Sequence, residues 1–432
     1  MTLNRSTTQH RNRLWAVLLA LALVAAACGS DSGAGDDSQS DDNASDDEAS
    51  DESQSEDDAS EDAADSDGSE TTSDEPIKIG IIADLTGPFT TYGTSLSRSA
   101  ELAVKEVNEA GGIDGRPVEV VVEDIQTDVT ATVDKARKLV ESDNVDLVMG
   151  PIGSDANDAA FKTVVEDAGR LLFYTETYEG GKCNDLYFSF GAVPAQQIRP
   201  MIPILQEEYG PNVMLFGADY VWPQRSFEIA KPIIAENGGT VVSELYLPLI
   251  ADDFSEFVQQ VRETKPDYIF SLYPAIWGSA LKALDDAGLL EDVGIGTIFL
   301  GDPDYAGIAE LAEGDFTALP FFTVAEGPGV GDFLAAYEAE FGAGEIPSGG
   351  EAIGAYNAVW MYKAAVEAAG STDPGSVADA LVGLSFDGPT GLVTMTESHH
   401  LAQTINLVQA VDGKYELVDA FPNQDPEESC SL

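Results

Sequence analysis

Residues 213–223 read VMLFGADYVWP. The first six form an apolar run that is typical of a strand buried in a parallel sheet. The run passes into Tyr220 and Trp222 and stops at Pro223. Open α/β sheets bind ligands beyond the carboxyl ends of their strands, so we expect this strand to end at a ligand cleft. Because side chains alternate along a strand, one of the two aromatic residues should face the core and the other the cleft.

A second strand end lies upstream of this stretch. Residues 178–180 (YEG) end a loop, residues 187–190 (YFSF) form a short apolar strand, and residues 194–197 (PAQQ) open a helix. The chain therefore crosses from one strand end to the next. We interpret this crossing segment as a hinge, with both strand ends facing one cleft.

Strands and helices alternate along most of the chain. The apolar strand 77–84 is followed by a helix that Gly111-Gly112 stop, and the alternation repeats as far as a strand at 296–301. Strands that alternate with helices predict parallel sheets with right-handed crossovers. Two such series in succession predict an α/β fold with two similar lobes.

The last third of the chain departs from simple alternation. Residues 321–324 and 386–391 are interpreted as a second and a third crossing. Asp412-Gly413 predicts a hairpin turn between strands at 404–411 and 415–420. Three amphipathic helices are expected between the crossings, at 332–341, 352–369 and 376–384.

Several short motifs carry a resemblance to a known family: LTGP at 85–88, NEAGGI at 108–113, YEG at 178–180, DYVWP at 219–223 and the pair His399-His400. The chain resembles the type 1 periplasmic-binding-protein fold, in the branch that serves ABC importers of urea, short-chain amides and branched-chain amino acids. The last three motifs look most like the urea and amide members. The resemblance covers nearly all of 77–428 and implies three crossover segments. It implies a lobe 1 made of residues 77–190 and 326–388, and a lobe 2 made of residues 191–325 and 389–432.

Residues 1–27 are expected to be a signal peptide. Three arginines precede an apolar run over 14–27, which is short for a membrane span. The run ends in AAA followed by Cys28, which looks like a bacterial lipobox. We expect Cys28 to carry lipid and to anchor the protein to the outer face of the cytoplasmic membrane. An uncleaved anchor helix is the alternative.

Residues 28–76 are expected to form a disordered acidic linker. From Asp31 to Glu75 there are 20 Asp and Glu residues and no Lys or Arg, a composition that stays extended. Residues 76–432 are acidic too, with 57 acidic against 18 basic residues. A protein this acidic is a poor candidate for binding nucleic acid or an anionic membrane, so neither is expected as a partner.

Residues 150–155 (GPIGSD) lie between a strand end and a helix start. Backbone N–H groups at such a place bind a carbonyl oxygen or a carboxylate, and Ser154 adds a hydroxyl. Ser154 is alternatively only a helix cap. Its position matches the ligand-binding serine of the family that the chain resembles, so we expect Gly153 and Ser154 to bind the ligand.

Later strand ends supply further candidates. Tyr174 matches a contact position of that family, and Glu176 is either solvated or a partner for a cationic or amide N–H group. Trp222 corresponds to the family's aromatic ligand wall, because an indole offers a flat apolar face and one donor. In amino-acid binders an acid near Asp302 holds the ammonium group. The weaker candidates are Tyr273, Trp277 and Asp302.

Cysteine and histidine usage limits the chemistry. If Cys28 is lipidated, Cys183 and Cys430 remain, and we expect them to form a disulfide in an exported protein. The spacing of Cys and His suggests no metal site, and no cofactor is expected because the sequence has no Walker loop and no GxGxxG after its first strand. Besides His10 in the leader, only His399-His400 are present, which nearly excludes a Ser-His-Asp or Cys-His catalytic set.

We expect a lipid-anchored receptor that closes on a small polar ligand and presents it to an ABC permease. A sensor module with the same fold and no transport role is the alternative, and an exported hydrolase is the least favoured. Urea or a short-chain amide ranks first as ligand and a branched-chain amino acid second. Against that order stands Ile152, where amide binders tend to carry an aromatic residue.

Overall fold

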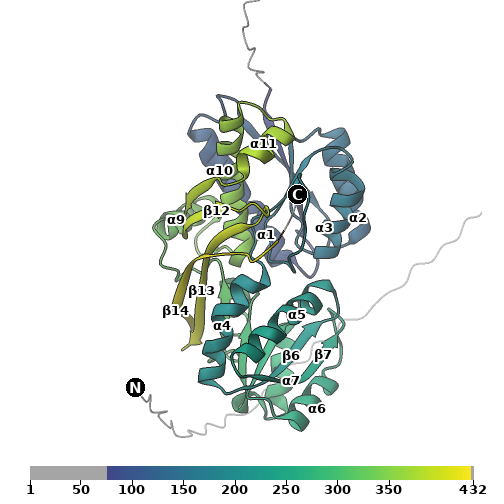
Figure 1. Ribbon diagram of the computed structural model, residues 1–432, viewed down its shortest axis with the longest axis vertical. Coiled ribbons are helices and arrows are strands. Elements are labelled where there is room, and N and C mark those ends of the chain that lie inside the picture. The colour runs from purple at the N-terminus through teal and green to yellow at the C-terminus, as the bar shows by residue number, and fades with distance from the viewer. Residues whose placement is uncertain (1–74, 430–432) are drawn as a thin grey trace, which may run out of the picture. The chain divides into compact units, whose positions relative to one another are not determined.

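The computed structural model describes residues 75–429. Expectations for the signal peptide, for Cys28, for most of the acidic linker and for Cys430 lie outside the described residues. Within the described part, strands and helices alternate as the sequence predicts, and the strands form two sheets (Figure 1). No helix between residues 75 and 429 is both long enough and apolar enough to cross a membrane.

The first sheet has five strands, all parallel, in the order β2-β1-β3-β4-β5. Its side chains alternate between two faces: Ile79 and Ile81 belong to one apolar core, and Ile82 belongs to the other. Burial on both faces explains why these strands are nearly continuous apolar runs. The strands are β1 (Ile77–Ala83), β2 (Val118–Asp124), β3 (Leu147–Met149), β4 (Leu171–Tyr174) and β5 (Tyr187–Ser189).

Helices from two distant parts of the sequence cover the first sheet. One core combines residues of the early helix α1 (Thr90–Glu109) with residues of α10 (Gly349–Ala369) and α11 (Pro374–Leu381). The other core contains residues of α2 (Val129–Arg137) and α3 (Ser154–Ala160), each of which continues as one π-helical turn. A further helix, α9 (Val330–Phe341), packs beside α1. The expected helices at 332–341, 352–369 and 376–384 are thus confirmed; the last two pack on the first sheet, and the first packs beside α1.

The second sheet joins parallel and antiparallel strands in the order β11-β12-β13-β10-β9-β8-β6-β7, with β14 paired to β13. Its parallel part is β6 (Asn212–Ala218), β7 (Thr240–Leu247), β8 (Tyr268–Leu272), β9 (Gly294–Thr297) and β10 (Phe316–Leu319). Its antiparallel part is β11 (Ser385–Gly388), β12 (Gly391–Met395), β13 (Leu401–Val411) and β14 (Lys414–Gln424). The helices around it are α4 (Pro194–Glu208), α5 (Val221–Glu236), α6 (Ser255–Thr264), α7 (Trp277–Asp286) and α8 (Asp302–Ala306), with a short 3₁₀ turn at Leu290–Asp292.

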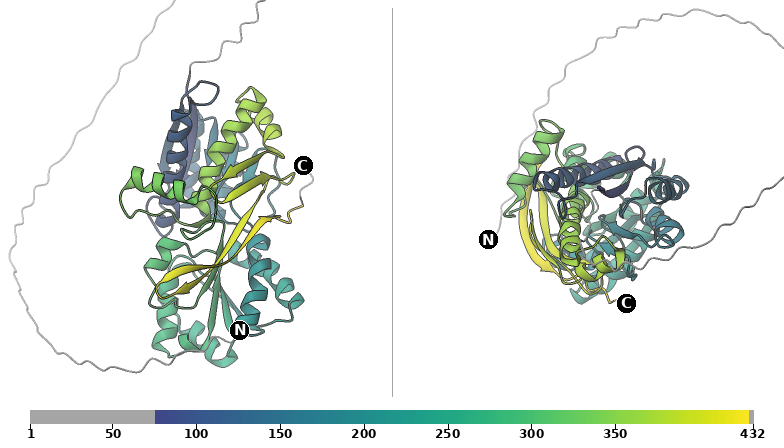
Figure 2. Two further views of the ribbon diagram at one scale, coloured as in Figure 1. Left: turned by 90° about the vertical axis from the view of Figure 1, so that its left-hand side faces the viewer. Right: turned by 90° about the horizontal axis from the view of Figure 1, so that it is seen from above.

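The long hairpin of β13 and β14 connects the two cores. Leu401, at the start of β13, belongs to the core of the first sheet, and Ile405 belongs to the core of the second. Figure 2 shows this hairpin in yellow, running from the elements of the first sheet along those of the second. The predicted turn at Asp412-Gly413 is confirmed, but β12 was not expected.

The PAQQ motif joins the start of α4 to the β13–β14 hairpin and to the ends of β9 and β10. The side-chain amide of Gln196 donates to the backbone carbonyls of Leu401 and Gln424, at 3.0 and 2.8 Å. The amide of Gln197 donates to the carbonyls of Ile298 and Ala318, at 3.2 and 2.7 Å. These bonds, three of them buried, give the motif a structural role, because they join the start of α4 to backbone carbonyls of four other segments.

The division into lobes at the predicted boundaries stays a prediction. Residues 389–432 were expected to belong to lobe 2, yet Val393, Met395 and Leu401 pack in the core of the first sheet.

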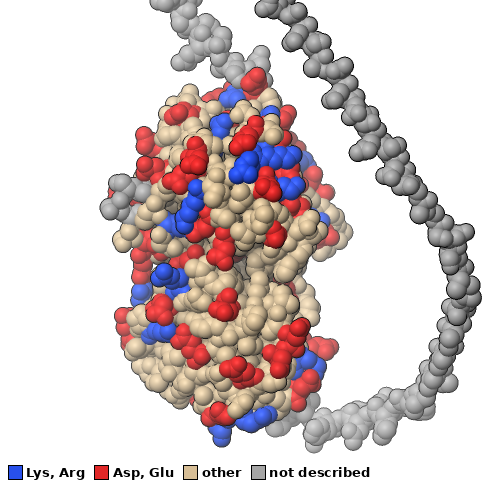
Figure 3. All heavy atoms as spheres, turned by 90° about the vertical axis from the view of Figure 1, so that its right-hand side faces the viewer, with Lys and Arg blue, Asp and Glu red and all other residues tan. Residues whose placement is uncertain are grey.

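The acidic surface expected from the composition is visible on one face in Figure 3, where acidic side chains lie over both ends of the molecule and basic side chains lie beside them. For example, Lys135 and Lys138 both pair with Glu123, at 2.5 and 2.6 Å.

Candidate functional site

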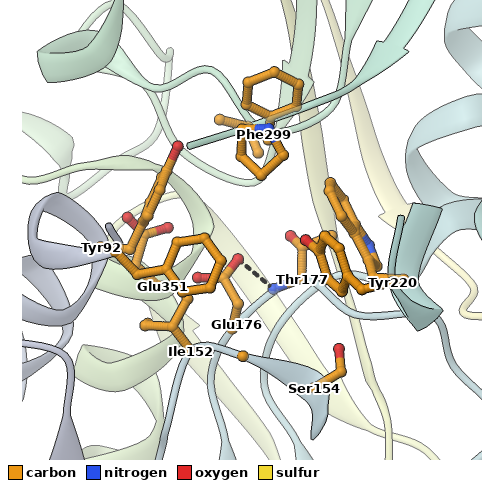
Figure 4. A pocket seen from close by; sticks show the side chains of 13 residues that line it. Tyr92, Ile152, Ser154, Glu176, Thr177, Tyr220, Phe299 and Glu351 are labelled. Carbon is orange, nitrogen blue, oxygen red and sulfur yellow. Dashed lines mark hydrogen bonds between the residues drawn. The ribbon is translucent and has the colours of Figure 1, made fainter. Parts of the chain in front are cut away.

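One cavity lies at the carboxyl ends of strands from both sheets (Figure 4). The residues that line it lie at or just after the ends of β1, β3 and β4 in the first sheet and of β6, β8, β9 and β10 in the second. One further lining residue belongs to α10. The empty space is about 470 Å³, part of which is open to solvent. The lining residues are Phe89, Tyr92, Ile152, Gly153, Ser154, Glu176, Thr177, Tyr220, Trp222, Pro274, Phe299, Leu319 and Glu351.

The loop that carries Ile152 is held by hydrogen bonds to its backbone. The N–H of Ile152 donates to a carboxylate oxygen of Asp84 at 3.3 Å, and its carbonyl accepts from the hydroxyl of Tyr174 at 2.6 Å. Tyr174 is fully buried and does not line the cavity. The structure thus places this expected ligand contact beneath the lining, where it positions the loop.

Ser154 and Gly153 line the cavity, as the sequence analysis expects. The Ser154 side chain makes no cap to its own helix; its hydroxyl donates to a carboxylate oxygen of Glu179 at 2.7 Å. Burial raises the pKa of Glu179. Glu179 belongs to the YEG motif, so the motif sets the orientation of the serine hydroxyl at the edge of the cavity.

Glu176 faces the cavity with one oxygen free of protein partners. Its Oε1 accepts from the backbone N–H of Thr177 at 2.7 Å, whereas its Oε2 is buried and has no hydrogen-bond partner. Burial, strengthened by the negative charges of Asp84 and Asp304, raises the pKa of Glu176 to about 8. Glu176 is therefore not a freely solvated acid, and its expected role as a partner for a ligand group stays a prediction.

Glu351, near the start of α10, is a second acid that the sequence analysis did not single out. Its side chain is 3% exposed, and its Oε1 is buried without a partner. Burial, followed by the negative charge of Glu176, raises the pKa of Glu351. A glutamate within the small and apolar run SGGEAIGA is the signal that would have revealed it.

Tyr220, Trp222 and Phe299 form an aromatic wall on the side of the second sheet. The rings of Tyr220 and Trp222 lie 6.3 Å apart between centroids, and Phe299 meets Trp222 edge-on at 6.5 Å. The expectation that only one of Tyr220 and Trp222 faces the cleft is wrong, because both line the cavity. Strand β6 ends at Ala218 and helix α5 begins at Val221, so the alternation of a strand does not apply there.

The weaker candidates lie outside the cavity lining. Tyr273 is fully buried, stacks on Phe216 at 5.0 Å and donates its hydroxyl hydrogen to the carbonyl of Pro248. Asp302 accepts from the backbone N–H of Thr323 at 3.1 Å and from its hydroxyl, which fastens the second crossing segment. Trp277 packs in the core of the second sheet.

The histidine pair is structural. His400 bonds the hydroxyl of Tyr178 through Nε2 and the carbonyl of Ser398 through Nδ1, and burial lowers its pKa to about 4. His399 stacks on Phe188 with 4.0 Å between ring centroids. Both therefore connect the segment before β13 to the first sheet.

Cys183 is disulfide-bonded, and its expected partner Cys430 lies outside the described residues.

Most of the lining was not predicted. Phe89 and Tyr92 come from the start of α1, and Pro274, Phe299 and Leu319 come from ends of strands in the second sheet. An apolar residue at a strand end looks the same in the sequence whether it faces a cavity or the core. Among residues 75–429 there is no group of three or more His, Cys, Asp and Glu side chains arranged to hold a metal ion.

A family model described as periplasmic binding protein matches residues 76–414, and the chain belongs to this family. It is a solute-binding protein and not an enzyme, and its family places it outside the cytoplasm.

Relatives and solved structures support the same class. The chain is 27% identical, over 338 residues, to a leucine-, isoleucine-, valine-, threonine- and alanine-binding protein of Pseudomonas aeruginosa, an alignment that covers 76% of this chain and 87% of the relative. It is 26% identical to a branched-chain amino acid transporter substrate-binding protein of Streptococcus pneumoniae, solved with isoleucine; the TM-score is 0.68, with 80% of this chain and 99% of the other covered. A solute-binding protein of an ABC transporter from Rhodopseudomonas palustris, solved with 3,4-dihydroxybenzoic acid, shares the fold at 22% identity, with a TM-score of 0.72 and coverage of 82% and 99%.

Proposed function

We propose that this protein is the receptor of an ABC importer and captures a small solute that carries an amine or amide nitrogen and an apolar body. One observation carries the proposal: the cavity is lined from both sheets, with Glu176 and Ser154 on one side and Tyr220, Trp222 and Phe299 on the other. A solute held between two halves stabilises the arrangement in which both contact it, which is how a receptor signals that it is loaded.

The lining supports a nitrogen-bearing ligand. When Glu176 is ionised, its unpartnered oxygen is an acceptor that a ligand N–H group satisfies. The aromatic wall and Ile152 supply apolar surface that urea is too small to cover. We therefore rank solutes with an aliphatic or aromatic body ahead of urea, which changes the order that the motifs alone indicate. The names of the amino-acid-binding relatives agree with this ranking.

Delivery to a permease and attachment by lipid at Cys28 belong to the same proposal. A lipidated Cys28 followed by an acidic tether over 28–76 keeps a receptor at the membrane while it samples solutes. The alternative is a sensor module with the same fold that transports nothing. Genes for a permease and an ATPase beside the gene of this protein favour the importer, and a neighbouring signalling gene favours the sensor.

The proposed function is tested by titrating the purified full-length protein with leucine, valine, short amides, simple amines and urea. Tryptophan fluorescence and melting temperature report binding, and a ligand at 100 times its Kd stabilises the protein by about 2.7 kcal/mol. We expect at least one nitrogen-bearing solute with an apolar body to raise the melting temperature, and Trp222→Ala to abolish the response. A protein whose melting temperature responds to none of these solutes contradicts the proposal.

A further inference from the structure

The lining of the cavity is unbalanced in charge. Its thirteen residues include two acids, Glu176 and Glu351, and five aromatic residues, yet none of the thirteen is Lys or Arg. Glu179 lies next to the lining, and the positive charge of Lys182 lowers its pKa, against the larger effect of burial, which raises it. Lys182 itself pairs with Asp158 at 2.5 Å and lies over the rings of three tyrosines outside the cavity.

Two side chains of the lining are more than nine-tenths buried and carry an oxygen without a protein partner. They are Glu351 through Oε1 and Thr177 through Oγ1, with 3% and 6% of their surface exposed. Buried polar atoms in proteins are nearly always hydrogen-bonded, so unpaired oxygens in the lining indicate a ligand that donates hydrogen bonds to them. In Figure 4, Glu351 and Glu176 reach the same space from different elements.

The other groups around the two acids do not offset their charge. Glu176 faces the carboxyl groups of Asp84 after β1 and Asp304 on α8, and Glu351 faces Glu176 and Asp304. The hydroxyls of Tyr92 on α1 and Tyr220 before α5 are neutral, and burial raises the pKa of both. An ionised carboxylate in such a place is costly unless an opposite charge comes with the ligand, which agrees with the raised pKa of Glu176.

The aromatic rings suit the same charge. Five aromatic residues line the cavity, Phe89, Tyr92, Tyr220, Trp222 and Phe299, and the face of an aromatic ring attracts a cation. A ligand carboxylate in this space would find no Lys or Arg side chain among the lining residues to pair with. We propose that the cavity takes an organic cation, an amine that has an apolar body and no carboxylate of its own, and that Glu351 is the residue that sets this preference. The inference rests on the proposed function and narrows its ligand class.

Two series of ligands test the inference, because within each series the body is shared and the charge changes. The first is isopentylamine, isovaleramide, leucine and isovalerate; the second is benzylamine and benzoate. Each is titrated into the full-length protein at neutral pH, and its Kd is measured by calorimetry. We expect the amine to bind at least tenfold more tightly than the amide or leucine, and neither carboxylate to bind measurably.

The variant Glu351→Gln keeps the shape and removes the charge, and we expect it to weaken amine binding at least tenfold. Asp315→Asn is the matched control. Asp315 is 5% exposed, has an unpartnered Oδ2 and lies outside the cavity lining, so its replacement should leave amine binding unchanged. If Glu351→Gln does not fold, the two ligand series in the unaltered protein remain decisive.

The outcomes separate this inference from the proposed function. Binding of leucine, isovaleramide, isovalerate or benzoate as tight as that of the matched amine overturns the inference and leaves the receptor function standing. An equal loss of amine binding in Asp315→Asn and Glu351→Gln also overturns it, because burial alone would then explain the effect. A protein that binds no member of either series, and none of the solutes titrated above, contradicts both.

Discussion

The hydroxyl of Tyr174 donates to the backbone carbonyl of Ile152 at 2.6 Å, and this bond joins the end of β4 to the loop that follows β3. The same loop residue donates its N–H to Asp84, which follows β1. Three neighbouring strands of the first sheet thus position one stretch of cavity lining. A residue that resembles a ligand contact in the sequence is here part of the support beneath the contact.

Removing the Tyr174 hydroxyl should destabilise the protein. In Tyr174→Phe the buried carbonyl of Ile152 loses its partner, and we expect the free energy of unfolding to fall by about 1–3 kcal/mol. Tyr362→Phe is the control, because the hydroxyl of Tyr362 is buried and unpartnered and its removal breaks no bond. Denaturant unfolding measures both. Equal stability of the two variants would contradict the role given to Tyr174.

Gly150 should tolerate no side chain. Its φ is +88°, and a Cβ there would lie 2.3 Å from the carbonyl oxygen of Ile82, which is backbone and cannot move aside. Gly115 has a similar φ of +78° and open space around it, so Gly115→Ala carries only the conformational cost of roughly 1–2 kcal/mol. We expect Gly150→Ala to lower the melting temperature well beyond Gly115→Ala. Matching melting temperatures would refute the steric argument.

The empty protein should lose stability as the pH rises from about 5 to 8. Burial raises the pKa of Glu176 to about 8 and that of Asp304 to about 7. An acid with a raised pKa binds its proton more tightly in the folded state, so its contribution is present below the unfolded pKa and is lost as the pH rises through the folded value. Melting temperatures across this range check the sign, and Glu176→Gln should flatten the slope. A melting temperature that increases over the range would contradict these pKa shifts.

The anchor is tested by Cys28→Ala. If Cys28 carries lipid, the variant should move from the membrane fraction to the soluble fraction of the cell envelope. Fractionation followed by immunoblotting measures the distribution. A variant that stays with the membrane would mean that the apolar run at 14–27 is an uncleaved anchor.

The sequence predicted the fold better than the site. Apolar strands alternating with helices, stopped by residues such as Gly111-Gly112, are sufficient to predict the parallel first sheet and the parallel part of the second, because each element must bury its own face. They did not predict the antiparallel strands β11 to β14 that extend the second sheet as a whole. The motif-bearing stretches at 178–180 and 219–223 adjoin or contain residues that line the cavity. They did not say which side chains reach the cavity, as Tyr174 and Tyr273 illustrate: both follow the expected pattern, and both lie outside the lining.

Glu351 could not be placed because it comes from the last third of the chain. It reaches the cavity only because α10 packs with α1 against the first sheet, although Glu351 lies 268 residues after Ala83, where β1 ends. Whether a residue faces the cavity or the core depends on how the elements pack together. The periodicity of the sequence along one element does not reveal it. The same limit explains why both Tyr220 and Trp222 face the cavity once β6 has given way to α5.

Buried carboxyl groups that receive a cation should bind it more tightly once they are ionised. The most direct measurement is the Kd of isopentylamine between pH 6 and 9, a range in which the amine stays charged. We predict that binding tightens as the pH rises and the pKa of Glu176 near 8 is passed, and that Glu176→Gln reduces this dependence. Binding that is independent of pH, or that weakens as the pH rises, would contradict the account.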